Sequence, residues 1–181
     1  MANIEHYSKN AIKNNMITLR PWVETDLELL ALYFNNINIW NNLRDYIPHP
    51  YSPEDAVKFI NAEKDKVPAL NFAILSGEEL VGGIGIILGE DVYRMNVELG
   101  YWIAEPFWGT GIATEAVRQM TYYVFENFAI NRIVAEVFEY NKTSMRVLEK
   151  NGYHLECVKR KGVLKNDYLY DDYVWVIQKI V

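Results

Sequence analysis

The segment with the clearest chemical pattern joins a strand to a helix through a glycine-containing loop. It reads Glu98-Leu-Gly-Tyr-Trp-Ile-Ala-Glu-Pro-Phe-Trp-Gly-Thr-Gly-Ile-Ala-Thr-Glu-Ala116. Gly109 and Gly111 lie where the loop becomes the helix, so no side chain covers the N–H groups at the positive end of the helix dipole. Such a turn binds a diphosphate through its main chain, without any lysine. Taken alone, Gly-x-Gly at this place is equally typical of a structural turn.

Two carboxylates close to this segment are candidate proton acceptors. Glu98 alternates with Gly100 and Trp102 on the strand that leads into the loop. Glu136 lies in an apolar strand pattern, where a buried carboxylate is unfavourable unless a partner or a reaction uses it. For each residue, a hydrogen-bonded or exposed strand position is the alternative interpretation.

The cysteine and histidine content argues against other kinds of site. The single Cys157 cannot form an intramolecular disulfide, and His6, His49 and His154 are scattered without metal-ligand spacing. No histidine neighbours Cys157 in a way that indicates a cysteine nucleophile. We therefore expect neither a metal site nor an acyl-cysteine intermediate.

Length and charge narrow the class of protein further. A chain of 181 residues with 50% hydrophobic and 23% charged residues is typical of one folded domain. The net charge of −6 argues against binding to nucleic acid or to an anionic membrane surface. The first residues lack a basic start followed by an apolar run, and no stretch approaches about 18 apolar residues, so we expect a cytoplasmic protein.

Hydrophobic periodicity indicates a mixed α/β domain that follows a polar N-terminal arm over residues 1–15. Strand patterns cover residues 16–20, 70–75, 80–88, 94–104, 132–139, 153–161 and 168–180. Helices are predicted from Thr25 with Glu28 in a capping box, from Ser52 with Pro53 in the first turn, from Ala113, and from Asn141, with one further turn near residues 39–43. The helix between the fourth and fifth strands favours parallel pairing of those strands. Residues 16–181 are therefore expected to form a single domain.

Glycines in the second strand of the central group need an explanation of their own. Gly82, Gly83 and Gly85 match neither a dinucleotide fingerprint nor a Gly-Lys-Ser/Thr loop. Glycine inside a strand marks a bulge or the close approach of another group. We therefore predict a structural role for them.

Longer sequence motifs around the glycine loop resemble those of a known protein family. Leu99-Gly-Tyr-Trp-Ile, Trp108-Gly-Thr-Gly111-Ile-Ala113-Thr-Glu-Ala116 and Asn141-Lys-Thr-Ser144-Met-Arg-Val-Leu-Glu-Lys-Asn-Gly152-Tyr153 resemble the GNAT superfamily of N-acetyltransferases. Together with Leu19-Arg20-Pro21-Trp22, they look most like the RimJ/RimL-type family of ribosomal-protein alanine N-acetyltransferases. The resemblance implies a mixed, mostly antiparallel central sheet of six to seven strands with helices on both faces.

The same resemblance implies how acetyl-CoA is bound. The backbone of Tyr101, Trp102 and Ile103 would pair with the pantetheine arm. The diphosphate would be wrapped by Gly109, Thr110, Gly111, Ile112, Ala113 and Thr114. Asn141 would reach the cofactor arm, although its place as a helix N-cap explains it equally well. Ser144 would lie near the thiol.

The implied reaction is direct acetyl transfer to an amine in a ternary complex. The enzyme must hold the amine, remove a proton and stabilise the oxyanion and the thiolate. We favour Glu98 slightly as the proton acceptor, because similar sequences often carry an acid on this strand, with Glu136 as the alternative. Tyr153, Tyr168 and Tyr170 are candidate phenols for the thiolate.

The sequence allows more than one acceptor substrate, more than one oligomeric state, and either a catalytic or a non-catalytic protein. A protein N-terminus and a small-molecule amine both fit the resemblance, and Arg44-Asp45 falls in the region that shapes the acceptor pocket in similar proteins. Some relatives carry a tyrosine at the position of Leu148 and a glutamate near Val163, and this chain has neither. A non-catalytic acyl-CoA sensor or interaction module on the same fold is therefore the alternative. Exposed aromatic residues would suit a homodimer.

Overall fold

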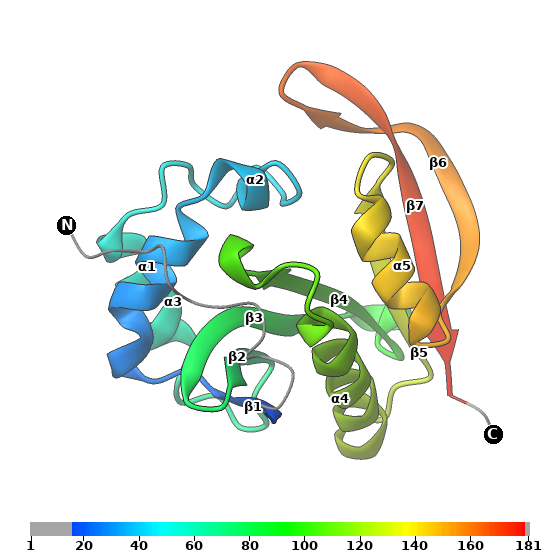
Figure 1. The fold of residues 1–181 in the computed structure, drawn as a ribbon. Helices are drawn as coiled ribbons and strands as arrows, with labels where there is room; N and C mark the ends of the chain where they lie inside the picture. Colours follow the sequence, from blue (N-terminus) through cyan, green and yellow to red (C-terminus); the bar gives the residue numbers. More distant parts are fainter. Residues whose placement is uncertain (1–15, 180–181) are drawn as a thin grey trace.

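One seven-stranded sheet organises the computed structural model, which describes residues 16–179 (Figure 1). The strand order is β1-β2-β3-β4-β5-β7-β6, and every neighbouring pair is antiparallel except β4 and β5. The strands are β1 (Ile17–Pro21), β2 (Asn71–Ser76), β3 (Glu79–Leu88), β4 (Asn96–Ile103), β5 (Arg132–Phe138), β6 (His154–Lys165) and β7 (Tyr168–Gln178). The predicted arm over residues 1–15 lies outside the described residues.

Five α-helices and three short 3-10 turns join the strands. The helices are α1 (Leu27–Phe34), α2 (Ile37–Trp40), α3 (Pro53–Glu63), α4 (Ile112–Asn127) and α5 (Lys142–Lys150). The 3-10 turns are η2 (Glu24–Asp26), η3 (Asp91–Tyr93) and η4 (Glu105–Phe107). The predicted fold class, a mixed and mostly antiparallel sheet with helices on both faces, is confirmed. No helix among residues 16–179 is long and apolar enough to cross a membrane.

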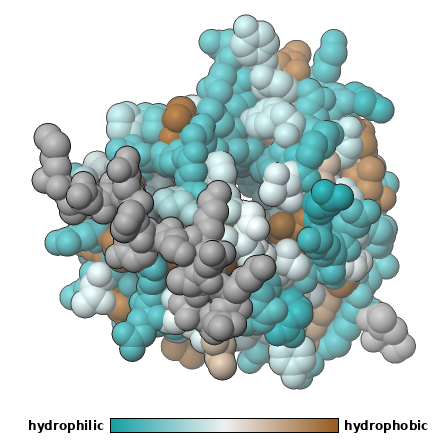
Figure 2. Space-filling view, viewed as in Figure 1, coloured by the Kyte–Doolittle hydropathy of each residue, from teal (hydrophilic) through white to brown (hydrophobic). Residues whose placement is uncertain are grey.

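Two hydrophobic cores form on the two faces of the sheet, because successive side chains of a strand point to opposite faces. In β2, Phe72 and Ile74 pack into the core beneath α4, whereas Ala73 and Leu75 pack into the core beneath α1 and α3. The face of the molecule in Figure 2 is mostly hydrophilic, with hydrophobic residues scattered over it. The described residues of that face show no extended apolar patch, and the predicted homodimer stays a prediction.

Local capping signals differ in how well they predict the helix starts. Ser52 caps α3 as predicted and forms a capping box, because its Oγ accepts from Asp55 N at 3.2 Å and Asp55 Oδ2 accepts from Ser52 N at 3.1 Å. The predicted cap at Thr25 is wrong. Buried Asp26 instead accepts two hydrogen bonds of 2.6 Å from Arg20 and one of 3.0 Å from Val23 N, so η2 forms first and α1 begins at Leu27.

The parallel strands β4 and β5 separate soon after they meet. They pair over Asn96–Glu98 and Arg132–Val134 only, whereas β4 continues along β3 to Ile103 and β5 continues along β7 to Phe138. The β4 edge that faces β5 is therefore without a strand partner from Leu99 onward. Helices α4 and α5 begin shortly after β4 and β5 respectively, so both helix N-termini open onto this split (Figure 1).

The strand glycines allow side chains to cross the sheet closely. A Cβ on Gly83 would lie 2.6 Å from Trp102 Nε1, and one on Gly85 would lie 1.7 Å from Asn71 Oδ1. A larger residue at either position would clash, which confirms the interpretation of these glycines as points of close approach. Gly83 in this way sets the position of the Trp102 indole.

Candidate active site

A cleft of about 1180 Å³ opens where β4 and β5 separate. The residues predicted to bind the cofactor, the two candidate proton acceptors and Ser144 all line it. They come from three places: β4, the turn before α4 with the first residues of that helix, and the strand and helix on the far side of the split. They are Glu98, Tyr101, Trp102, Ile103, Gly109, Thr110, Gly111, Ile112, Ala113, Thr114, Glu136, Asn141 and Ser144. The fold therefore brings together residues that are more than 40 positions apart in the chain.

The turn before α4 has the backbone geometry that requires glycine. Gly109 has φ +76° and Gly111, the N-cap of α4, has φ +90°. A Cβ at either position would meet no atom of the described residues within 4 Å. The left-handed conformation, rather than crowding, therefore explains both glycines, and the space above them is open to a ligand.

The N–H groups of this turn are free to bind an anion. Among the hydrogen bonds of the described residues, none is donated by the backbone N–H of residues 109–114, and the first bond of the helix is that from Glu115 N to Gly111 O at 3.2 Å. Trp108 Nε1 donates to Ile103 O at 2.6 Å and Thr110 Oγ1 donates to Phe107 O at 2.6 Å. These two side-chain bonds hold the loop in a conformation that leaves its N–H groups without acceptors among the described residues.

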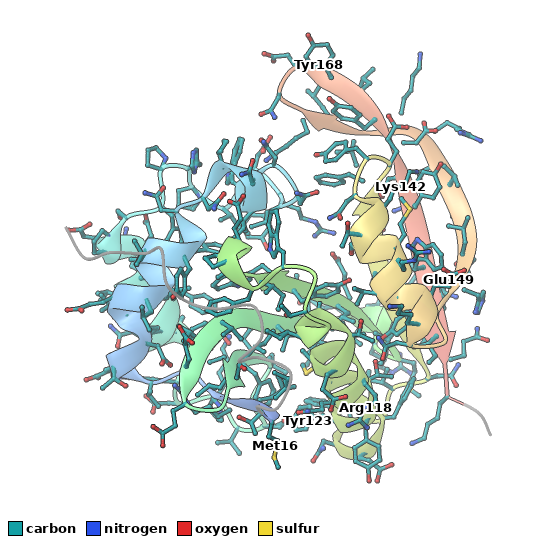
Figure 3. All side chains as sticks on the ribbon, viewed as in Figure 1. Met16, Arg118, Tyr123, Lys142, Glu149 and Tyr168 are labelled. Carbon is teal, nitrogen blue, oxygen red and sulfur yellow. The ribbon has the colours of Figure 1, made fainter. Side chains whose placement is uncertain are left out.

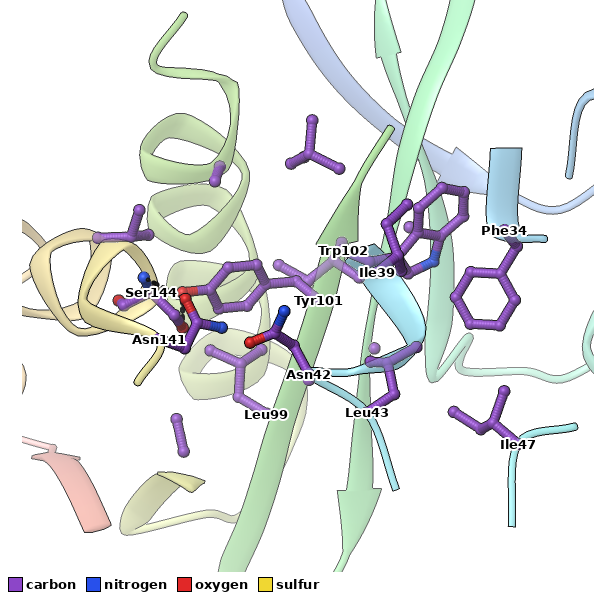
Figure 4. A pocket seen from close by; sticks show the side chains of 18 of the residues that line it. Phe34, Ile39, Asn42, Leu43, Ile47, Leu99, Tyr101, Trp102, Asn141 and Ser144 are labelled. Carbon is purple, nitrogen blue, oxygen red and sulfur yellow. Dashed lines mark hydrogen bonds between the residues drawn. The ribbon is translucent and has the colours of Figure 1, made fainter. Parts of the chain in front are cut away.

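Across the split, the side chains of β4 and α5 meet. Tyr101 Oη lies 2.8 Å from Ser144 Oγ, and Asn141 Oδ1 accepts from Ser144 N at 3.1 Å (Figure 4). Burial raises the pKa of Tyr101 to about 12, although the hydrogen bond with Ser144 acts to lower it. The phenol is therefore neutral at physiological pH and can donate a hydrogen bond. Only the backbone of Tyr101 was expected in the site, because strand spacing alone does not show which side chain spans the split.

The other candidate phenols lie away from the cleft. Tyr153 is buried in the core and bonds to Thr121 Oγ1 at 2.8 Å. Tyr168 is exposed at the tip of the β6–β7 hairpin (Figure 3), and Tyr170 packs edge-on against Tyr140. Tyr101 is therefore the phenol that the fold places beside Ser144.

Glu98 and Glu136 meet at one guanidinium. Arg44 Nη2 lies 2.5 Å from Glu98 Oε1 and 3.5 Å from Glu136 Oε2. Lys159 also contacts Glu136, and lies 3.5 Å from Asp172 Oδ2. Burial lowers the pKa of Arg44, but the charges of Glu98 and Glu136 outweigh this and raise it above its ordinary value. Arg44 thus stays charged and ties the segment after α2 to both candidate bases.

Lys165 holds the segment that carries Arg44. Only 1% of this lysine is exposed, although it lies near the tip of a hairpin that extends beyond the rest of the sheet (Figure 1). Its Nζ donates to Asp45 Oδ1 at 2.6 Å and to Leu43 O at 3.0 Å, and lies 3.2 Å from the centre of the Trp40 ring. The β6–β7 hairpin is thereby joined to the residues that form one wall of the cleft.

We expect Lys165→Met to lower the free energy of unfolding by about 2 kcal/mol, because it removes charge-assisted hydrogen bonds and a cation–π contact but keeps the aliphatic volume. Urea unfolding measures this. Lys161→Met is the matched control, since Lys161 is exposed on the same strand and its loss changes the net charge equally. Equal stability of the two variants would show that Lys165 does not hold this wall.

Comparison with known proteins agrees with this geometry. The family model described as Acetyltransferase (GNAT) domain matches residues 16–154. The chain is 30% identical over 179 residues to the protein named Probable N-acetyltransferase YjcK of Bacillus subtilis strain 168, covering 92% of this chain and 96% of YjcK. It is also 30% identical over 98 residues to the ribosomal-protein-serine acetyltransferase of Escherichia coli K12, covering 54% of each chain.

Among solved structures, the microcin C7 self-immunity acetyltransferase MccE, in complex with acetyl-CoA and AMP, matches with a TM-score of 0.79 and 25% identity over 92% of this chain and 94% of MccE. No group of three or more residues that would bind a metal ion is found among residues 16–179. The family model covers most of the chain, as does the similarity to YjcK. The chain therefore belongs to the GNAT family of acetyltransferases.

Proposed function

We propose that this GNAT enzyme transfers the acetyl group of acetyl-CoA directly to a primary amine in a ternary complex. The observation that carries the proposal is the row of free N–H groups over residues 109–114 at the N-terminus of α4, next to the unpaired edge of β4. A diphosphate on the turn and an extended arm along β4 would use both features. MccE, which has the same fold, was solved with acetyl-CoA bound.

Each part of the cofactor has residues that fit it. Residues 109–114 would bind the diphosphate, and the backbone of Tyr101, Trp102 and Ile103 would pair with the pantetheine arm, with Ile103 O already engaged by Trp108. Asn141 can cap α5 and bind at the same time, because Oδ1 makes the cap while Nδ2 has no acceptor among the described residues. Acetyl-CoA would supply the activated thioester.

The side chains at the split supply the remaining chemistry. The neutral amine nitrogen forms a bond to the acetyl carbon as the carbon–sulfur bond breaks, so one proton must leave the nitrogen and one must reach the sulfur. An acceptor that arrives as an ammonium first loses a further proton to the solvent, because only the neutral amine has the lone pair that attacks. Glu98 is the proposed proton acceptor, with the incoming amine competing with Arg44 for its carboxylate. The Tyr101 and Ser144 hydroxyls bond to one another, and the one that accepts in this bond keeps its own hydrogen for the proposed donation to the thiolate.

A covalent cysteine route does not fit this site. Cys157 is exposed on β6 and does not line the cleft. Direct transfer therefore needs no further nucleophile. A protein N-terminus remains a candidate acceptor, which the similarity to the Escherichia coli ribosomal-protein-serine acetyltransferase supports over about half of the chain. A cytoplasmic location and the homodimer remain predictions.

Steady release of free thiol from acetyl-CoA in the presence of amines tests the activity. Varying both substrates should give intersecting reciprocal plots, as a ternary complex requires, and Cys157→Ser should keep the rate. Parallel plots and a Cys157→Ser variant without activity would indicate an acyl-enzyme instead. CoA binding without thiol release for any amine would favour the sensor.

A further inference from the structure

The acceptor end of the cleft has an apolar wall. Phe34, Leu43, Ile47 and Trp102 are half-buried and line it together (Figure 4). The ring centres of Phe34 and Trp102 lie 4.8 Å apart. Phe34 is the last residue of α1, Leu43 and Ile47 lie between α2 and α3, and Trp102 comes from β4. The wall therefore stands opposite the Tyr101 and Ser144 hydroxyls.

Hydrogen bonds keep this wall in place. Trp40 Nε1 donates to Ile47 O at 2.8 Å, and Tyr51 N donates to Asn35 Oδ1 at 3.0 Å. Lys165 holds Leu43 through its carbonyl oxygen. An apolar surface that is fixed and left partly exposed inside a cleft is available to an apolar ligand group, because little reorganisation opposes binding.

The carboxylates of the cleft all have partners already. Glu98 contacts Arg44, Glu136 contacts Lys159 and Arg44, and Asp55 is bound to Ser52 in the cap of α3. The described lining carries no other acidic residue. Its cationic residues are Arg44, Lys58, Arg146 and Lys150. A polyamine in the cleft would thus meet at least as many cationic side chains as carboxylates. Glu98 could bind one ammonium group if that group displaced Arg44.

We propose that the acceptor carries one ammonium next to an apolar body, such as an aryl or branched alkyl group. The nitrogen would reach Glu98, and the body would pack on Phe34, Leu43, Ile47 and Trp102. This rests on the proposed acetyl transfer to an amine. The same chemistry occurs in a small monoamine and in a peptide whose first residue is apolar, and the test separates these two sources.

Thiol release at fixed acetyl-CoA should be measured for phenethylamine, isoamylamine, ethanolamine, putrescine and spermidine, and for the peptides Phe-Gly-Gly and Asp-Gly-Gly. We expect kcat/KM for phenethylamine to exceed that for ethanolamine and for spermidine by about tenfold or more, because an apolar pocket discriminates mainly by buried area. Phe-Gly-Gly above phenethylamine would identify a peptide as the source. Spermidine or ethanolamine equal to phenethylamine would overturn the proposal.

A substitution in the apolar wall tests the proposal independently. Leu43→Ser should reduce kcat/KM for phenethylamine by about tenfold more than it reduces kcat/KM for ethanolamine. Leu32→Ser is the control, because Leu32 is exposed on α1 and does not line the cleft. A Leu43→Ser variant with undiminished preference for phenethylamine would contradict the assignment.

Failure of the proposed function can be told apart from failure of this inference. If no amine releases thiol, calorimetric titration of phenethylamine and of spermidine into the CoA complex still measures which amine binds. Tighter binding of phenethylamine would support the apolar acceptor end in a protein that does not turn over. Tighter binding of spermidine would overturn it.

Discussion

Gly111→Val is expected to weaken CoA binding and to raise the KM for acetyl-CoA by about 100-fold, because it would disturb several of the proposed hydrogen bonds between the turn and the diphosphate at once. Gly111 has φ +90°, which a β-branched residue adopts only with strain, and the new side chain would enter the open space above the turn. Calorimetric titration with CoA and initial rates in acetyl-CoA measure the two effects.

Gly152→Val is the control that separates the effect of Gly111→Val on CoA binding from its effect on backbone strain. Gly152 has φ +80° at the end of α5, outside the cleft, so valine there meets the same conformational difficulty. Both variants should lose about 1–2 kcal/mol in the free energy of unfolding. Only Gly111→Val should lose affinity for CoA. Equal dissociation constants for CoA in the two variants would show that the turn does not bind the diphosphate.

Glu98→Gln is expected to lower kcat by about 100- to 1000-fold, because the amide keeps the shape and the contact with Arg44 but cannot accept a proton. The KM for acetyl-CoA should stay unchanged, since Glu98 lies away from the phosphate turn. Initial rates at varied concentrations of acetyl-CoA and of the amine provide both measurements.

Glu136→Gln tests the alternative assignment in the same assay. Glu136 contacts Lys159 as well as Arg44, so its carboxylate is shared between two cations. We expect its variant to keep kcat within about tenfold of the parent. If Glu136→Gln loses the rate and Glu98→Gln keeps it, the role of proton acceptor passes to Glu136.

Features formed by neighbouring residues were the predictable part of this protein. The cap at Ser52 depends on residues three positions apart, and the turn at Gly109 and Gly111 depends on backbone conformation next to a helix start. The cap predicted at Thr25 failed for the opposite reason. Arg20, six positions from Asp26, binds the carboxylate of this residue, which is the N-cap of α1.

Contacts between segments that are distant in the chain could not be predicted from a single sequence. Arg44 and Glu98 are 54 positions apart, and Tyr101 and Ser144 are 43 apart. Lys165 reaches Asp45 across 120 positions, and no local pattern distinguishes it from an exposed hairpin lysine. The hydrophobic patterns predict the strand and the helix that carry these residues, but only the fold shows which side chains meet in the split.

The most direct test of the phosphate turn is a crystal structure of the protein with CoA bound. We predict that the diphosphate oxygens lie within hydrogen-bond distance of the backbone N–H groups of residues 109–114, with the thiol directed toward Tyr101 and Ser144. A structure in which the diphosphate binds elsewhere and this turn holds only solvent would contradict the account.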